Sequence, residues 1–207
     1  MRGEHPKNIR IIDLRRPSRK DMIVGRAAEV EFVSADIRDP ASIRAAFAVG
    51  WPQSHAKGIT VFHTVAGIRY YERHQSLLVR SSVLNVDGTQ NTLTAAKEAG
   101  VDIFIFTSSA SIPLCRTSFW VWPWQKHPKT FVQVVNDETR PSSKHAKQNE
   151  FFSNYAYTKY LAERLVCEAD DPANDFRTGC LRPGNAIFGS GGDLNAGAYL
   201  VRGMNPS

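Results

Sequence analysis

Short runs of Ile, Val, Phe and Leu recur along the 207-residue chain, and most are bounded by Gly, Pro, Asp or Ser. Runs of this length and composition are typical of β-strands buried in a sheet. They predict strands at residues 8–14, 30–34, 60–65, 102–107 and 177–182.

Longer segments between these strands have apolar residues at helical spacing. In residues 76–99 the apolar positions that follow this spacing are Leu78, Val83, Val86, Leu93 and Ala96. Residues 40–49 and 155–169 are also predicted to be helical. Strands that alternate with helices of this length indicate an α/β fold, a Rossmann-like doubly wound parallel sheet with helices on both faces.

Two of the predicted helix ends carry specific signals. Asp39 is placed to cap the helix at 40–49, with Pro40 at its first position. Gly100 follows the helix at 76–99, and glycine at such a position commonly ends a helix.

The helix predicted at 155–169 begins with Tyr155 and has Lys159 four residues later. Residues four apart lie on the same face of a helix, so Lys159 is expected to place its ammonium beneath the phenol of Tyr155. A nearby cation lowers the pKa of a tyrosine from its usual value of about 10, which prepares the phenol for proton exchange with an alcohol. Ser109, just beyond the strand at 102–107, is placed to hold the substrate oxygen. The same spacing arises by chance on amphipathic helices, so it leaves both interpretations open.

Composition and charge narrow the class of protein. The chain is 42% hydrophobic and 22% charged, as is ordinary for a globular domain. A net charge of +6 raises the question of nucleic acid, but the basic residues are scattered in nothing longer than pairs such as Arg15-Arg16. We therefore expect no nucleic-acid partner and a surface that attracts an anionic dinucleotide.

The cysteines and histidines do not indicate a metal site. Cys115, Cys167 and Cys180 lack metal-ligand spacing, and their odd number is typical of a reducing compartment. His63 lies inside an apolar strand and is predicted to be a hydrogen-bonded core histidine. The chain shows no signal-peptide pattern and no apolar stretch of the ~18 residues that a membrane helix needs. We expect no metal and an intracellular, cytoplasmic location.

Eight motifs follow one another in a recognisable order. They are Ile9-Arg-Ile-Ile-Asp-Leu14, Ser34-Ala-Asp-Ile-Arg-Asp39, Val61-Phe-His-Thr-Val-Ala66, Asn85-Val-Asp-Gly-Thr-Gln-Asn91, Phe106-Thr-Ser-Ser-Ala110, Asp137-Glu-Thr-Arg-Pro141, Tyr155-Ala-Tyr-Thr-Lys-Tyr-Leu-Ala-Glu163 and Leu181-Arg-Pro-Gly184. In this order they resemble the extended short-chain dehydrogenases/reductases. Within these the chain looks most like the 3β-hydroxysteroid dehydrogenase group, especially its sterol-4α-carboxylate 3-dehydrogenase branch. The likeness covers most of residues 8–190.

The resemblance implies a dinucleotide site at the carboxyl ends of the strands. Asp13 is expected to bind the adenosine ribose and to favour NAD over NADP, although the neighbouring Arg15 and Arg16 leave NADP open. Further cofactor contacts are implied for Asp36 and Ile37 at the adenine, for Val65, Ala66 and Gly67 along the dinucleotide, and for Pro183 and Asn185 near the nicotinamide.

The resemblance also implies roles for the catalytic residues. Tyr155 is the acid/base, Ser109 rather than Ser108 orients the substrate oxygen, and Lys159 also binds the nicotinamide ribose. Tyr157 is excluded as the acid/base because Leu161, not a lysine, follows it at the required spacing. Asn85 corresponds to an asparagine that braces the central strands.

Two departures from the family pattern stand out. The family begins with a strand and a Gly-x-x-Gly-x-x-Gly turn that binds the pyrophosphate, whereas Gly3 is the only glycine here before Gly25. The chain is thus expected to be a partial Rossmann-like domain over residues 1–207, truncated at both ends, with the substrate-side region starting after residue 183. Residues 112–133 form an insertion without counterpart and include Phe119-Trp-Val-Trp-Pro-Trp124. This insertion is either a surface loop or translated intron, or a lid or membrane-touching loop.

Three hypotheses follow for the function. The leading one is an NAD-dependent oxidoreductase that oxidises the 3β-hydroxyl of a steroid or sterol to a ketone. The second uses the same residues on nucleotide sugars, as an epimerase or dehydratase, or on flavonoid-type ketones. The third is a catalytically silent chain, either a truncated pseudoenzyme or a fragment that folds only with a partner, because loss of a central strand exposes two internal strand edges. The resemblance further implies a homodimer and association with the endoplasmic reticulum membrane.

Overall fold

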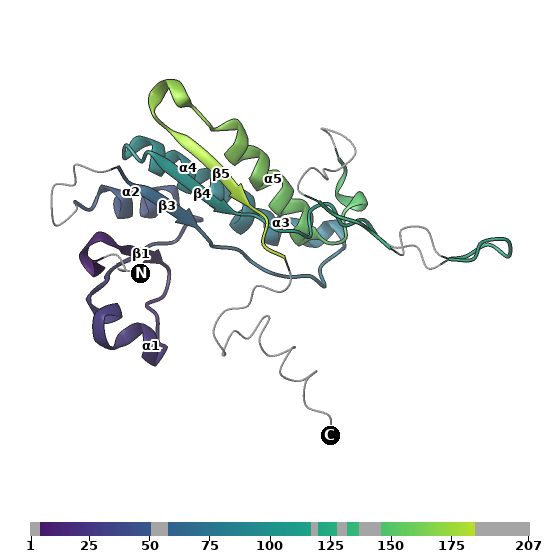
Figure 1. Ribbon diagram of the computed structural model, residues 1–207, viewed down its shortest axis with the longest axis horizontal. Helices are drawn as coiled ribbons and strands as arrows, with labels where there is room; N and C mark the ends of the chain where they lie inside the picture. The colour runs from purple at the N-terminus through teal and green to yellow at the C-terminus, as the bar shows by residue number, and fades with distance from the viewer. Residues whose placement is uncertain (1–4, 51–57, 117–119, 128–131, 137–145, 185–207) are drawn as a thin grey trace.

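A computed structural model describes residues 5–50, 58–116, 120–127, 132–136 and 146–184 (Figure 1). Its strands are β1 (Arg10–Asp13), β2 (Glu31–Ser34), β3 (Thr60–His63), β4 (Ile103–Thr107) and β5 (Arg177–Leu181). Its α-helices are α1 (Lys20–Ile23), α2 (Pro40–Ala48), α3 (Leu78–Ser82), α4 (Gly88–Glu98) and α5 (Asn154–Glu168). A π-helical turn, η4 (Val83–Asp87), joins α3 to α4, and short 3₁₀ turns are η1 (Pro6–Asn8), η2 (Gly25–Glu29), η3 (Gln75–Leu77), η5 (Gln148–Glu150) and η6 (Pro172–Asn174).

All strand pairs in the described residues are parallel. β1 pairs with β2, and a second sheet has the order β3-β4-β5. Each strand overlaps the segment predicted from the sequence and is slightly shorter than it. The parallel α/β, Rossmann-like fold class is therefore confirmed, with small sheets.

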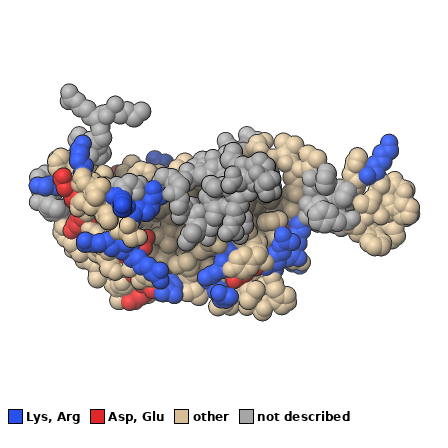
Figure 2. All heavy atoms as spheres, turned by 90° about the horizontal axis from the view of Figure 1, so that it is seen from below, with Lys and Arg blue, Asp and Glu red and all other residues tan. Residues whose placement is uncertain are grey.

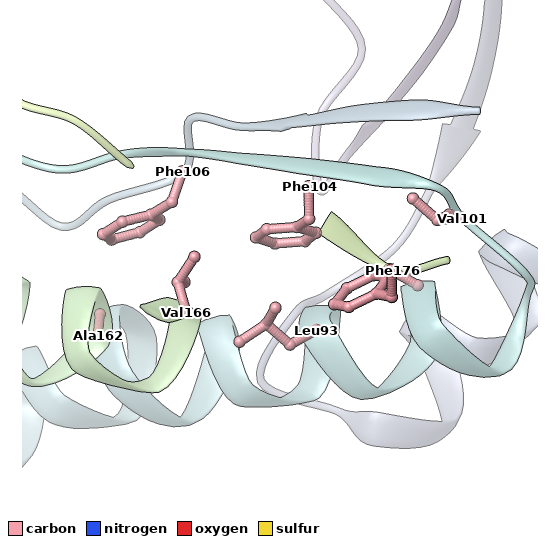
Figure 3. Close-up of a cluster of buried hydrophobic side chains, with 8 residues drawn as sticks. Leu93, Val101, Phe104, Phe106, Ala162, Val166 and Phe176 are labelled. Carbon is pink, nitrogen blue, oxygen red and sulfur yellow. The ribbon is translucent and has the colours of Figure 1, made fainter. Parts of the chain in front are cut away.

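The main core lies between β4 and the helices on one face of its sheet. Phe104 and Phe106 alternate with less buried neighbours along β4 and point toward α4 and α5, as Figure 3 shows. Leu93 of α4 and Val166 of α5 pack against these rings, with Val101 and Phe176 nearby. Burying an aromatic side chain stabilises a fold by about 1.5–3 kcal/mol, so this cluster fixes the position of α5 on the sheet.

Both predicted helix-end signals are confirmed. The Asp39 carboxylate accepts a hydrogen bond of 2.9 Å from the backbone N–H of Ala41, which caps α2. Gly100 has a φ of +70° and lies just after α4. A left-handed residue at this point lets the chain turn from the helix into β4.

The helix predicted at 76–99 is interrupted. Its first part is the short turn η3 followed by α3, and the π-helical turn η4 then adds a residue before α4 begins. The single helical period read from the sequence therefore does not hold across the whole segment. Val83, expected on the apolar face, is 37% exposed, whereas Ser81 and Asn85 are buried.

Part of the insertion at 112–133 is described. Ile112 is buried in a cluster with Ala146, Phe151, Ala156 and Tyr160. Trp120, Trp122 and Trp124 are exposed, and the rings of Trp122 and Trp124 stack at 5.2 Å between centroids. The boundaries of the insertion and of the domain stay predictions.

On the face that Figure 2 shows, the Lys and Arg side chains do not form one continuous patch. In Figure 2, Lys and Arg side chains form several separate groups with acidic side chains beside some of them. Within the described ranges, no cluster of three His, Cys, Asp or Glu side chains could hold a metal ion. None of the helices in the same ranges is long and apolar enough to cross a membrane.

Candidate active site

The two serines after β4 have different partners. The Ser108 hydroxyl donates to the Glu163 carboxylate at 2.5 Å, and Arg182 also binds that carboxylate. Ser109 is buried and lies 2.8 Å, Oγ to Oγ, from Ser111. Ser109 also lies close enough to Tyr155 to act on the pKa of its phenol. Of the two, Ser108 is therefore engaged by Glu163, and Ser109 is the one that acts on Tyr155.

The first turn of α5 presents Tyr155 to the end of β4. Ser153 caps this helix, because its hydroxyl accepts a hydrogen bond of 3.2 Å from the N–H of Ala156. Tyr155 and Lys159 are both buried, as expected for two residues on one helix face turned toward the sheet. Tyr157 instead packs against Phe151, with ring centroids 5.2 Å apart, in the cluster on another side of the helix.

The pKa of Tyr155 differs from the expectation. Burial first, and then the neighbouring Tyr70, raise this pKa to about 12, while Ser109 acts in the opposite direction. We expected Lys159 to lower it. The spacing of Tyr155 and Lys159 determines only that both lie on one face of the helix. The pKa of Tyr155 depends as well on how much water its phenol loses on burial, and that is determined by all the residues packed around it.

The Lys159 ammonium is directed to the backbone of β4. Its Nζ donates to the carbonyl of Thr107 at 2.5 Å and lies 4.2 Å from the centroid of the Phe106 ring. Burial lowers the pKa of Lys159 to about 8, and Cys180 and Glu163 partly oppose that change. Near neutral pH this lysine therefore keeps its charge but is poised to release a proton in mildly alkaline solution.

Sequence reasoning missed the segment that covers Tyr155. Tyr70 contacts Tyr155 edge-on, with ring centroids 5.0 Å apart. Two residues later the buried Glu72 forms ion pairs with Arg69 and Arg80, at 3.8 and 3.4 Å. The backbone carbonyl of Glu72 also accepts a hydrogen bond of 2.9 Å from the first residue of α5. No local pattern signals this role, because the segment reads as an ordinary polar loop.

Asn85 braces the loop after β3 against α5. Its side-chain amide exchanges two hydrogen bonds with the backbone of Gly67 and donates to the Thr158 hydroxyl at 3.0 Å. A side chain at Gly67 would approach Leu84 to 3.0 Å, so the loop needs a small residue there. These contacts join the loop after β3 to α5, and the bracing of the central strands that the resemblance implies stays a prediction.

The cofactor candidates fall into two groups. Asp13, Ile37 and Val65 line one cavity of about 1190 Å³ between β1 and β3. The Asp13 carboxylate is exposed and accepts a hydrogen bond of 3.0 Å from the N–H of Arg15.

Asp36 has a competing partner. Its carboxylate binds Arg38, at 2.9 and 2.6 Å, and these hydrogen bonds lower the pKa of Asp36.

The second group lies nearer the catalytic candidates. Ala66 and Gly67 follow β3 beside Asn85, and the carbonyl of Pro183 accepts a hydrogen bond of 3.3 Å from Ala110, next to Ser109. Asn185, like residues 137–141, lies outside the described residues. The cofactor roles of all these positions stay predictions.

This chain is an α/β domain of the Rossmann type. Its parallel strands alternate with helices, and buried polar side chains lie at the strand ends. A family model described as the 3-beta hydroxysteroid dehydrogenase/isomerase family matches residues 1–201. The chain therefore belongs to that family.

Individual relatives agree with the family model. An Arabidopsis thaliana protein named 3beta-hydroxysteroid-dehydrogenase/decarboxylase isoform 2 is 30% identical over 82% of this chain and 24% of its own length. A Saccharomyces cerevisiae sterol-4-alpha-carboxylate 3-dehydrogenase, decarboxylating, is 36% identical over 53% of this chain and 26% of its own. The chain thus spans about a quarter of the length of these relatives.

Solved structures agree in fold. A Thermus thermophilus UDP-glucose 4-epimerase in complex with NAD superposes with a TM-score of 0.60 at 19% identity, covering 93% of this chain and 52% of that one. At this identity the likeness concerns the fold alone.

Proposed function

We propose that this chain carries the catalytic serine, tyrosine and lysine of an NAD-dependent oxidoreductase that oxidises the 3β-hydroxyl of a steroid or sterol to a ketone. The observation that carries the proposal is that Ser109, Tyr155 and Lys159 are all buried where the end of β4 meets the first turns of α5, with Lys159 Nζ bonded to the carbonyl of Thr107. Family membership supports the substrate class, since the matched relatives are named for 3β-hydroxysteroid and sterol-4-alpha-carboxylate dehydrogenation.

The residues at the strand ends suit a dinucleotide. The exposed Asp13 carboxylate can accept hydrogen bonds from ribose hydroxyls, and it repels a 2′-phosphate, which favours NAD over NADP. The apolar side chains of Ile37 and Val65 line the same cavity as Asp13 and can pack against an adenine ring. When bound, NAD supplies the acceptor for the hydride that leaves the carbinol carbon.

The residues of the chain then handle the proton and the oxygen. The Ser109 hydroxyl forms a hydrogen bond with the substrate oxygen. The Tyr155 phenol exchanges a proton with that same substrate oxygen. Because the pKa of Tyr155 is raised to about 12, its phenol is protonated at neutral pH. In the cofactor-free chain it is therefore set to donate a proton, as ketone reduction requires. Alcohol oxidation needs a lower pKa, and the ammonium of Lys159, one helical turn away, is the group suited to provide it.

The test is NADH formation from a 3β-hydroxysteroid by the purified chain and three variants. Removing a positioned acid/base typically costs about 10²–10⁴-fold in rate, so Tyr155→Phe and Ser109→Ala should lose that much activity. Tyr157→Phe, on the same helix but in a different cluster, is the matched control and should keep its activity. Equal losses in Tyr155→Phe and Tyr157→Phe would contradict the assignment.

The competing hypotheses give different outcomes. The Tm measured with and without NAD distinguishes a catalytically silent chain that still binds NAD from a chain that has no NAD site. Ligand at about a hundred times its Kd adds ~2.7 kcal/mol to the folded state. A Tm raised by NAD without turnover of any alcohol would indicate a silent NAD-binding protein, and turnover of nucleotide sugars but not steroids would indicate an epimerase-type or dehydratase-type enzyme. Homodimer formation and association with the endoplasmic reticulum membrane stay predictions.

A further inference from the structure

Two cysteines face each other across the contact between α5 and β5. The sulfur of Cys167, in the last turn of α5, lies 3.9 Å from the sulfur of Cys180, in β5. Both are thiols, and Cys115 is the remaining cysteine of the chain. Residues 168–179 lead from one thiol to the other through the turn η6. The two thiols are therefore neighbours in space although they are thirteen positions apart in sequence.

Polar contacts on both sides of the pair hold the helix and the strand in register. The Thr178 hydroxyl donates at 2.8 Å to the backbone carbonyl of the residue before Cys167. Further along the contact, Arg182 forms an ion pair with Glu163, one helical turn before Cys167. A strand places alternate residues on one face, so Cys180 lies between Thr178 and Arg182 on the face turned to α5. The fold thus keeps the two sulfurs close together.

The two thiols differ in their access to solvent. Cys167 is exposed, whereas Cys180 is half-buried and packs against the main core. Burial first, and then the neighbouring Cys167 and Glu163, raise the pKa of the Cys180 thiol, which keeps it protonated at neutral pH. The thiolate is the reactive form of cysteine, and its reactivity also requires access. Cys167 is therefore the group that a reagent in solution meets first.

We propose that Cys167 and Cys180 are a redox modification site that a low-molecular-weight disulfide oxidises reversibly. The Cys167 thiolate attacks one sulfur of the reagent, which forms a mixed disulfide and releases the first small thiolate. Cys180 then loses its proton and attacks the Cys167 sulfur, which forms the protein disulfide and releases the second small thiolate. The two protons of the protein thiols pass to the two released thiolates. The protein loses two electrons and the reagent gains them. This inference does not depend on the proposed enzymatic activity.

The arrangement allows the disulfide to close with the backbone in place. A disulfide holds its sulfurs about 2.05 Å apart, so closure brings these two nearer by about 2 Å. Rotation about a Cα–Cβ bond between staggered positions moves a cysteine sulfur by a comparable distance. Because folding already brings the thiols together, the disulfide should form more readily in the folded chain than in the unfolded one. By linkage, it should then stabilise the fold.

Oxidation acts on the helix that carries the candidate catalytic residues. Figure 1 shows α5 beside β5, and the two elements are in contact. Lys159, Glu163 and Cys167 are spaced four apart, so they lie on one face of α5. A disulfide at Cys167 ties the far end of that face to the strand. The site therefore couples the redox state of the surroundings to the stability of this helix.

Peptide mapping of the oxidised chain tests the pairing. The purified chain is incubated with glutathione disulfide and reduced glutathione, alkylated and digested with trypsin. Trypsin cleaves after Arg177, so the two cysteines lie on separate peptides that only a disulfide holds together. The main product should be a monomer on a non-reducing gel, with the linked pair and one of the three thiols left over. A main product linked through Cys115, or mixed disulfides without the linked pair, would overturn the proposal.

Serine variants test the role of each thiol. Cys115→Ser is the matched control and should oxidise like the unsubstituted chain. In that background, Cys180→Ser should stop at a mixed disulfide on Cys167. Cys167→Ser should form its mixed disulfide about tenfold or more slowly, because the remaining thiol is half-buried. A faster reaction of Cys167→Ser than of Cys180→Ser would overturn the proposed order of attack.

The same oxidation in concentrated urea distinguishes a site built by the fold from two cysteines close in sequence. The linked pair should form about tenfold or more favourably in buffer than in urea, at the same ratio of glutathione disulfide to glutathione. The oxidised chain should have a higher Tm, and dithiothreitol should restore both the thiols and the original Tm. Equal formation in buffer and in urea, or a Tm lowered by oxidation, would refute a site prepared by the fold.

Discussion

Acidification should destabilise the fold through His63 in particular. This side chain is 4% exposed and stacks against the rings of Phe104 and Phe106, whose centroids lie 5.7 and 5.8 Å away. Its Nε2 lies 3.1 Å from the Thr89 hydroxyl. Because that hydroxyl donates its own hydrogen to the carbonyl of Asn85, its oxygen accepts from His63 Nε2–H. The expectation of a hydrogen-bonded core histidine is thus confirmed.

The size of the effect follows from the pKa. Burial, with a smaller contribution from the charge of Lys159, lowers the pKa of His63 from 6.5 to about 3. Between these values the unfolded chain binds more protons than the folded one, so stability is fully present above 6.5 and is lost as pH falls toward 3. At 1.36 kcal/mol per pKa unit, lowering the pH from 7.5 to 5 costs about 2 kcal/mol through this one side chain.

Urea unfolding at the two pH values measures that cost. His63→Gln keeps an N–H donor for Thr89 but does not titrate, so its stability should fall by about 2 kcal/mol less than that of the unsubstituted chain. Carboxylates with lowered pKa, such as Asp36, contribute equally to both proteins and cancel in the comparison. Equal losses for His63→Gln and the unsubstituted chain would refute the reasoning.

Four further predictions concern packing, capping and charge. Asn85→Leu removes three hydrogen bonds from buried groups and should cost about 2–4 kcal/mol in denaturant melts. Gly88→Ala places a Cβ 2.6 Å from the side chain of Ile37 and should lower the free energy of unfolding by about 1–3 kcal/mol. A Tm equal to that of the unsubstituted chain would contradict this prediction. Asp39→Ala should cost about 1 kcal/mol, and Asp39→Asn, which keeps the cap, much less. Because burial lowers the pKa of Lys159 from 10.5 to about 8, stability should rise with pH across that window, and Lys159→Met should abolish the rise in melts taken at successive pH values.

The sequence predicted local structure best where one residue controls the outcome. Asp39 and Gly100 act through backbone geometry within a few residues, so their roles could be read without the fold. The strands were also placed well, because their apolar runs are short and bounded. The helix at 76–99 was placed correctly but misread internally. Its buried face carries polar residues such as Asn85, which bond to segments far away in sequence.

The candidate site shows the same limit. The spacing of Tyr155 and Lys159 correctly indicated a shared helix face, because that depends only on helical geometry. The direction of the pKa change at Tyr155 was wrong for the cofactor-free chain, because it depends on burial and on Tyr70, which comes from a distant loop. Glu72 was missed for the same reason, since its partners come together only in the folded chain.

The π-helical turn has a consequence for comparing this chain with its relatives. In η4 the N–H of Gly88 bonds to the carbonyl of Val83, five residues back, instead of the usual four. Removing one residue from 83–87 would therefore convert the turn to ordinary α-helix while both flanking helices kept their present faces. The same deletion inside α4 would rotate everything after it by about 100° and carry Leu93 and Ala96 out of the core. Length differences in this helix among homologous chains should accordingly be aligned within residues 83–87.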